Sequence, residues 1–425
     1  MAKVSEFSES QLVHMNQGKL ILTSLFCLLF FFGISAKAQR TIENLDQSLR
    51  YSRYSRLGLK IIPIQTRTDS YKLLMQVEKI EENPSFDVFN FSYAILNAYD
   101  EEITEEKIIL LNSNDLSMDT ERHWVFEKEV TIPEGTDTQI ALLSVLDTRQ
   151  GDEYLYHVDL KGSYVYDQPR LGAFYANGVA FDQNFINQSE SLLFDSFDGP
   201  SIHAFYYPIN FSIPYPPMET RPANVPKELD VIDKGDFVEN LPRSLDDEGY
   251  YFFQTDTTDL GGLMIKTTHE AFPKVKDWEE MVDIVTYIST RKEHEALLKA
   301  EDKKKALDEY WIGMTRNPDT AKEVIREYFR QIEFANILFT DFKEGWKTDR
   351  GMVYIVMGPP NEVNFFEDRE VWTYGGTGQA SKIKFTFARI KNVLTPHYYT
   401  LNRSRAYQPV WFKNISEWRN GRMAF

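Results

Sequence analysis

Residues 57–165 alternate between apolar and polar side chains with a period of two, and this pattern restricts the fold more than any other feature of the chain. In the segment 71–77 every second residue is apolar: Tyr71, Leu73, Met75 and Val77. Because successive side chains of a strand point to opposite faces, such a segment buries one face and exposes the other. Similar segments lie near 59–65, 86–98, 105–111, 123–132, 138–146 and 154–161. About seven strands at this spacing predict an antiparallel β-sandwich of immunoglobulin-like type over residues 57–165.

Residues 168–275 are also rich in β-forming residues, but their pattern is irregular. Strands are expected within the segments 201–213, 249–256 and 261–267. Six prolines fall in the stretch 208–228, which favours an extended edge or loop because proline cannot donate to a sheet ladder. We therefore expect a second, smaller and irregular β-domain with a long proline-rich loop over residues 168–275.

The period changes after residue 276 to the spacing of amphipathic helices. Apolar residues recur three or four positions apart in the segment 290–314, and Thr290 and Glu293 have the spacing of a capping box. A proline turn at 316–319 interrupts the pattern. A second helix, with Thr320 and Glu323 at the same capping spacing, is expected to end near Phe342. Two helices joined by a short turn predict an antiparallel helical hairpin.

The stretch "EGWKTDRGMVYIVMGPPNEV", residues 344–363, follows the hairpin. Gly345 is expected to end the helix in a left-handed conformation, with Trp346 packing against the hairpin. The short side chains of Thr348 and Asp349 can bond backbone N–H groups and fix a turn. Arg350 is expected to pair with a nearby carboxylate, either Asp349 or Glu333.

A continuous apolar run at 352–357 predicts a strand buried on both faces, and Gly351 precedes it. Gly358, Pro359 and Pro360 end this run because two prolines remove two backbone donors. Further strands at 370–376, 382–390 and 397–402 complete a small sheet. Residues 277–425 are therefore expected to form an α+β domain in which the hairpin packs on this sheet. The chain as a whole is predicted to be multidomain, β-rich at its N-terminal side and α+β at its C-terminal side.

These residues carry a resemblance to a known family. The helix "EYWIGMTRNPDTAKEVIREYFRQIEFAN" followed by "GWKTDRGMVYIVMGPPNEV" resembles the GWxTD-domain family of bacterial exported proteins. The positions that match the family pattern are Gly345, Trp346, Thr348, Asp349, Arg350, Gly351, Gly358, Pro359 and Pro360. The resemblance covers roughly residues 280–400 and implies no enzymatic activity. One departure is Asn317 in the hairpin turn, where the family pattern is closer to Arg-Asp-Pro.

The N-terminus has the order of a secretory signal peptide over residues 1–38. Lys19 precedes an apolar run at 20–34, and Ala36-Lys37-Ala38 forms a small-x-small cleavage site before Gln39. Met15 is an alternative start, because Glu6 and Glu9 suit the basic region of a signal poorly. The run is shorter than the roughly 20 residues that cross a bilayer. Cleavage would remove Cys27, the only cysteine, so the mature chain is expected to be exported and to contain no disulfide.

The net charge of −17 excludes the basic footprint that nucleic-acid binding requires. Two His-Glu pairs resemble the start of a zinc-protease helix motif, but Pro273 and Leu298 stand where the second histidine belongs. The sequence therefore predicts no metal site, no cofactor and no catalytic residues, and the motif residues are interpreted as structural.

Two functions from different classes remain. The first is a non-catalytic cell-envelope protein, located in the periplasm or associated peripherally with the outer membrane of a Gram-negative bacterium, that acts as a structural or protein–protein interaction module. An envelope protein is then the expected partner, with no nucleic acid and no transmembrane segment in the mature chain. The aromatic residues 205–207 and the proline-rich loop would suit such contacts. The alternative is a hydrolase or carbohydrate-active protein with a site near the turn at Asp349 and Arg350.

Overall fold

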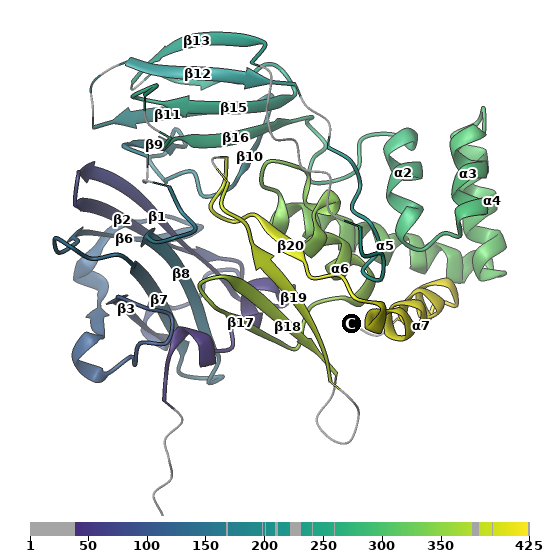
Figure 1. Ribbon diagram of the computed structural model, residues 1–425, viewed down its shortest axis with the longest axis horizontal. Helices are drawn as coiled ribbons and strands as arrows, with labels where there is room; N and C mark the ends of the chain where they lie inside the picture. The colour runs from purple at the N-terminus through teal and green to yellow at the C-terminus, as the bar shows by residue number, and fades with distance from the viewer. Residues whose placement is uncertain are drawn as a thin grey trace, which may run out of the picture. The chain divides into compact units, whose positions relative to one another are not determined.

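A computed structural model describes residues 39–166, 169–197, 199, 201–208, 211–221, 231–239, 241–258, 260–375, 382–392 and 394–423. The expected signal peptide 1–38, with Met15 and Cys27, lies outside the described residues, and so does part of the proline-rich loop. Residues Thr41–Phe425 form one compact unit (Figure 1).

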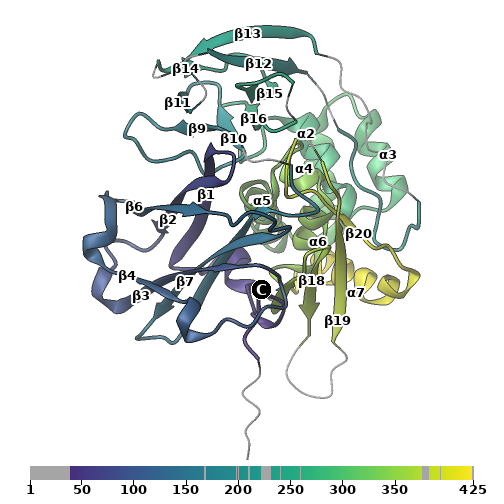
Figure 2. The same ribbon diagram turned by 60° about the vertical axis from the view of Figure 1, so that its left-hand side comes forward.

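The first described β-structure is a sandwich of two antiparallel sheets, as the alternating pattern predicts. One sheet has the order β1-β2-β6-β5 and the other has the order β4-β3-β7-β8 (Figure 2). Their bounds are β1 (Leu57–Arg67), β2 (Ser70–Lys79), β3 (Phe89–Leu96), β4 (Ile109–Leu111), β5 (Leu116–Asp119), β6 (His123–Thr131), β7 (Gln139–Asp147) and β8 (Glu153–Lys161). In chain order this division places strands one, two, five and six together, which is the immunoglobulin-like arrangement.

Strand β8 is buried on both faces, although its sequence alternates. Tyr154 and Tyr156 face the interior of the sandwich, whereas Leu155 joins the core formed with the C-terminal elements. His157 and Asp159 lie on this second face and are also buried. The apparently polar face of β8 is therefore a contact surface for later parts of the chain.

Two further sheets follow the sandwich. A five-stranded sheet has the order β10-β16-β15-β12-β13, in which β10 and β16 are parallel, and a three-stranded sheet has the order β14-β11-β9. The bounds are β9 (Leu171–Phe174), β10 (Phe185–Asn187), β11 (Ser191–Ser196), β12 (Ser201–Tyr207), β13 (Asp233–Val238), β14 (Arg243–Ser244), β15 (Gly249–Gln254) and β16 (Leu263–Thr268). Residues 205–207 lie at the end of β12, where they pair with β15 and are half-buried.

The helical part contains one more break than the sequence pattern predicts. Thr290 and Glu293 do form a capping box, but the expected single helix ends at Lys299 because Asp302 caps a new helix by accepting a hydrogen bond from the Lys305 amide. The bounds are α2 (Trp278–Ile284), α3 (Arg291–Lys299), α4 (Lys303–Thr315) and α5 (Pro318–Phe339). The second capping box is wrong: Asn317 caps α5, and Pro318 occupies its first position.

The C-terminal sheet has the antiparallel order β17-β18-β19-β20. Its bounds are β17 (Glu362–Phe365), β18 (Arg369–Tyr374), β19 (Ile383–Arg389) and β20 (Tyr399–Leu401), and α7 (Gln408–Arg419) follows. The prediction of a strand at 352–357 is wrong, because this run belongs to α6 (Asp349–Met357), whose residues are all buried. Helix α6 contacts α5, α7 and β20, so apolar side chains are required all around it.

Candidate functional site

Gly345 lies where two parts of the backbone approach each other closely. It begins a short 3₁₀ turn, Gly345–Lys347, and does not adopt the left-handed conformation expected for a helix end. A Cβ at this position would lie 1.9 Å from the carbonyl oxygen of Ala335 in α5. A Cβ at Gly351 would in turn lie 1.9 Å from the carbonyl oxygen of Gly345. Both glycines are therefore needed because α5, the turn and α6 are stacked without room for a side chain.

Trp346 is a core residue with a side chain that packs against the ring of Tyr287. Its backbone amide donates to Oδ1 of Asn336 in α5 at 3.0 Å, and the Tyr287 hydroxyl donates to its carbonyl at 2.6 Å. Only 1% of Trp346 is exposed, so the indole has no access to a ligand in solution.

Thr348 and Asp349 use their polar atoms inside the protein. The Thr348 hydroxyl donates to the Gly345 carbonyl at 2.8 Å and accepts from the Gly351 amide at 2.9 Å, which caps α6. Asp349 accepts from the Leu401 amide in β20 at 2.8 Å and forms a buried ion pair with Arg403. Thr348 fixes the local turn as expected, whereas Asp349 joins α6 to a strand far along the chain.

Arg350 does not pair with Asp349 or Glu333, as the sequence led us to expect. Its Nη1 donates to Oε2 of Glu370 in β18 at 3.2 Å, and its Nη2 donates to the His397 carbonyl at 3.0 Å. Glu370 is fully buried and also accepts from the Tyr51 hydroxyl at 2.7 Å. Burial opposes the Arg350 charge, but Glu370 outweighs it and raises the pKa of the guanidinium.

The stretch Gly358, Pro359 and Pro360 ends α6 rather than a strand. Gly358 has a φ of +78°, which a residue with a Cβ rarely adopts, and its amide bonds to the Tyr354 carbonyl at 2.8 Å. The hydroxyl of Tyr374 donates to the Gly358 carbonyl at 2.8 Å and ties this end to β18.

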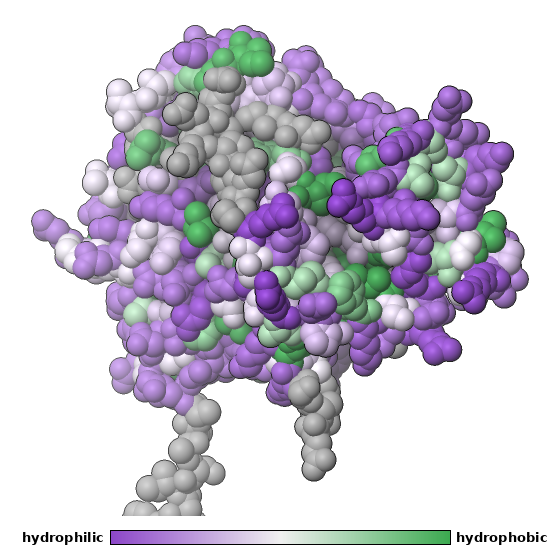
Figure 3. Space-filling view, turned by 45° about the vertical axis from the view of Figure 1, so that its right-hand side comes forward, coloured by the Kyte–Doolittle hydropathy of each residue, from purple (hydrophilic) through white to green (hydrophobic). Residues whose placement is uncertain are grey.

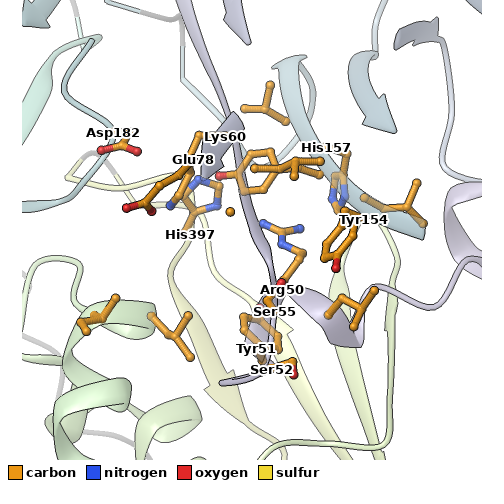
Figure 4. Close-up of a pocket in the computed structure, with 18 of the residues that line it drawn as sticks. Arg50, Tyr51, Ser52, Ser55, Lys60, Glu78, Tyr154, His157, Asp182 and His397 are labelled. Atoms are coloured by element: carbon orange, nitrogen blue, oxygen red, sulfur yellow. The ribbon is translucent and has the colours of Figure 1, made fainter. Parts of the chain in front are cut away.

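A cavity of about 260 Å³ lies next to Arg350, and most residues of its wall are not among the predicted site residues (Figure 4). Its wall combines residues of the 3₁₀ turn Ser48–Tyr51, β1, β8, the loop around Asp182, α5 and β20. Arg350 is the one motif residue in this wall; Trp346 and Asp349 do not line it. The sequence contains one signal for it: His157 and Asp159 alternate with apolar residues in β8, a pattern that by itself predicts a solvent-facing side.

Histidines, cysteines and carboxylates form no cluster that could hold a metal ion in the part of the chain that the structure describes. Within the same residues, no helix is both long and apolar enough for a membrane span. The surface drawn in Figure 3 is mostly hydrophilic, with apolar side chains in small separate groups, as the acidic composition would lead one to expect.

Comparison with known proteins supports the resemblance found in the motif. No curated protein matches this chain. The family model of the GWxTD domain matches residues 249–420, which adds β15, β16 and α7 to the segment recognised from sequence. The match contains the helices, the corner at 345–351 and the C-terminal sheet described above, and residues 249–420 of this chain are therefore similar to the GWxTD domain.

Proposed function

We propose that this protein is an exported, non-catalytic component of the bacterial cell envelope, in which the GWxTD domain is a structural module that supports contacts with another envelope protein. The observation that carries the proposal is that the polar side chains of three consecutive motif residues are used inside the protein. The polar groups of Thr348, Asp349 and Arg350 are buried and bonded to other parts of the same chain. Residues arranged in this way stabilise a fold and leave no group free to attack a substrate.

The alternative of a hydrolytic site at Asp349 and Arg350 has less support. A catalytic carboxylate must reach a substrate or a water molecule. Asp349 is held by the Leu401 amide and Arg403, with only 6% of its side chain exposed. Arg350 is fixed by Glu370, so neither group is available for acid–base chemistry without local unfolding.

Export is tested by N-terminal sequencing of the protein purified from its native host. The mature chain is expected to begin at Gln39 and to fractionate with the periplasm or the outer membrane. A matched variant that starts with Met at residue 39 should stay in the cytoplasm. Mature protein that begins before Gln39 would contradict the assignment of residues 1–38 as a cleaved signal.

Interaction is tested by crosslinking in intact cells, followed by affinity purification from the envelope fraction. One envelope protein should be recovered reproducibly with the wild-type chain and lost with Gly345→Val, which disrupts the domain. Recovery of the chain alone, at crosslinker concentrations that capture known envelope complexes, would argue against an interaction module.

A further inference from the structure

The cavity described above opens to solvent and is large enough for a small molecule. Ile80 and Ile337 line it and are 55% and 47% exposed, so its wall reaches the surface on that side. Its volume of about 260 Å³ exceeds the roughly 150 Å³ of an engineered cavity that holds benzene. A ligand of the size of a monosaccharide would therefore fit.

Two cations in the wall have no carboxylate partner among the described residues. Arg50 and Lys60 both lie over the ring of Tyr156, at 4.1 and 5.6 Å from its centroid. By contrast, the other two guanidinium groups in the wall, those of Arg350 and Arg389, form buried ion pairs. A half-buried charge without a counter-ion is unfavourable. An anion from solution would serve as the counter-ion of Arg50 and Lys60.

The two carboxylates near Lys60, those of Glu78 and Asp182, do not act as its counter-ion in an ion pair. Glu78 pairs at 3.0 Å with Arg122, which is not part of the cavity wall. Asp182 forms no ion pair within the described residues, and burial raises its pKa, although Lys60 opposes the shift. Among the charged groups of the wall that form no ion pair within the described residues, two cations, Arg50 and Lys60, therefore stand against one carboxylate, that of Asp182.

Two histidines add hydrogen-bonding groups to the same space, and their rings are drawn near Arg50 in Figure 4. Burial and the nearby arginines hold the pKa of both His157 and His397 well below the usual range, so both are neutral. The His157 Nδ1 donates to Oε1 of Gln47 at 3.0 Å, which leaves Nε2 as an acceptor. The His397 ring forms no hydrogen bond to any described residue, so it has a donor and an acceptor to offer.

We propose that this cavity binds a small polyhydroxylated anion, such as a sugar acid or a sugar phosphate. Arg50 and Lys60 balance the charge of its carboxylate or phosphate, because guanidinium and ammonium groups bind both. His157 and His397 bond its hydroxyl groups, and Arg50 is held in place by the rings of Tyr156 and Phe365, two further residues of the wall. This site is independent of the proposed envelope function and of the motif residues Trp346 and Asp349.

The test is calorimetric titration of the protein purified from its native host with three probes: glucuronate, glucose 6-phosphate and glucose. At least one of the two anions is expected to bind with a stoichiometry of one, and glucose should bind at least about tenfold more weakly, because hydrogen bonds to a charged group are stronger than those between neutral groups. Binding of glucuronate alone would identify a carboxylate site, and binding of glucose 6-phosphate alone would identify a phosphate site.

Variants locate the binding in the cavity. Arg50→Gln and Lys60→Gln should each weaken anion binding by about tenfold or more. Lys161→Gln is the matched control, because Lys161 ends the same strand as His157 but is exposed and outside the cavity wall. Arg50 also packs on Phe365, so Arg50→Gln could weaken binding by destabilising the protein. If this variant has a lower melting temperature, Lys60→Gln alone tests whether the cavity binds the anion.

Three outcomes would overturn the proposal. These are no measurable heat with either anion at millimolar concentration, equal affinity for glucose and the anions, and anion binding that neither cavity variant weakens.

Discussion

Asp159 in β8 and Arg389 in β19 form an ion pair in the protein interior, although 230 positions separate them in the chain. Their side chains are 5% and 3% exposed. The Tyr99 hydroxyl donates to the same carboxylate at 2.9 Å, and the Pro396 carbonyl accepts from the guanidinium at 3.0 and 3.1 Å. The sandwich and the C-terminal sheet are thus joined by a charge pair whose remaining polar atoms are also bonded.

The first prediction concerns this pair. Arg389→Met should lower the free energy of unfolding by about 3–5 kcal/mol, because it leaves the Asp159 carboxylate buried without a counter-charge. Asp159→Leu combined with Arg389→Met should cost less than Arg389→Met alone. Urea denaturation measures both. The control is Arg369→Met, which removes an exposed pair with Asp368 and should cost under about 1 kcal/mol. An Arg389→Met variant as stable as this control would contradict the interpretation.

The second prediction concerns the indole of the motif. Trp346→Ala should cost about 3–5 kcal/mol, the range for truncating a large buried aromatic residue. Trp278→Ala is a suitable control because Trp278 is 42% exposed, and its loss should have a small effect. Thermal unfolding of the two purified variants provides the measurement. An unchanged midpoint for Trp346→Ala would show that the corner does not contribute to stability.

The third prediction compares two glycines, Gly345 and Gly313, whose surroundings in the fold differ. Gly345→Ala should destabilise the protein by several kcal/mol, because its Cβ would overlap the Ala335 carbonyl oxygen. Gly313→Ala in α4 meets no atom within 4 Å and should be neutral or stabilising by up to about 1 kcal/mol, since alanine favours helices. Chemical denaturation of both variants compares them. Equal stability of the two variants would mean that α5 and the turn at Gly345 can move apart without a cost in free energy.

The fourth prediction is a pH dependence. Burial raises the pKa of Asp341 from 3.8 to about 6. The folded state then binds more protons than the unfolded state between about pH 4 and 6, so this residue lowers stability as the pH rises through that window.

Asp341→Asn keeps the oxygen that accepts from the Lys343 amide at 3.2 Å but removes the titration. The variant should therefore gain on the order of 2–3 kcal/mol over the wild type between pH 4 and 7. Melting temperatures measured across this range provide the comparison. A constant difference between the two proteins would show that Asp341 does not titrate there.

Helix α6 shows where reading the sequence fails. The run 352–357 is apolar at every position, and such a run has no period that separates a helix from a strand. Tertiary packing decides the outcome: α6 is enclosed by α5, α7 and β20, and Thr348 and Gly358 cap its two ends. Thr348 caps the helix by accepting from the Gly351 amide, but the same short polar side chain is equally compatible with a turn before a strand.

The partners of the charged motif residues also could not be predicted. Arg350 pairs with Glu370, 20 positions away, and Asp349 pairs with Arg403, 54 positions away. Adjacency in the sequence favours Asp349, but the buried guanidinium bonds with the carboxylate that the sheet places beside it. The cavity was missed for the same reason, because residues from Arg50 to His397 meet only in the folded chain.

The sequence alone determined part of the local structure of this protein. Alternation with a period of two specified the sandwich strands, the Thr290 and Glu293 spacing specified a helix start, and the ordered motif specified the similarity to the GWxTD domain. These features depend on interactions within a few residues, which backbone geometry fixes. The tertiary structure decided the secondary structure of the fully apolar run, the partners of Asp349 and Arg350, and the cavity between β1, β8 and β20. Each of these depends on groups that are distant in the chain and are brought together only when the separate elements bury their surfaces against one another.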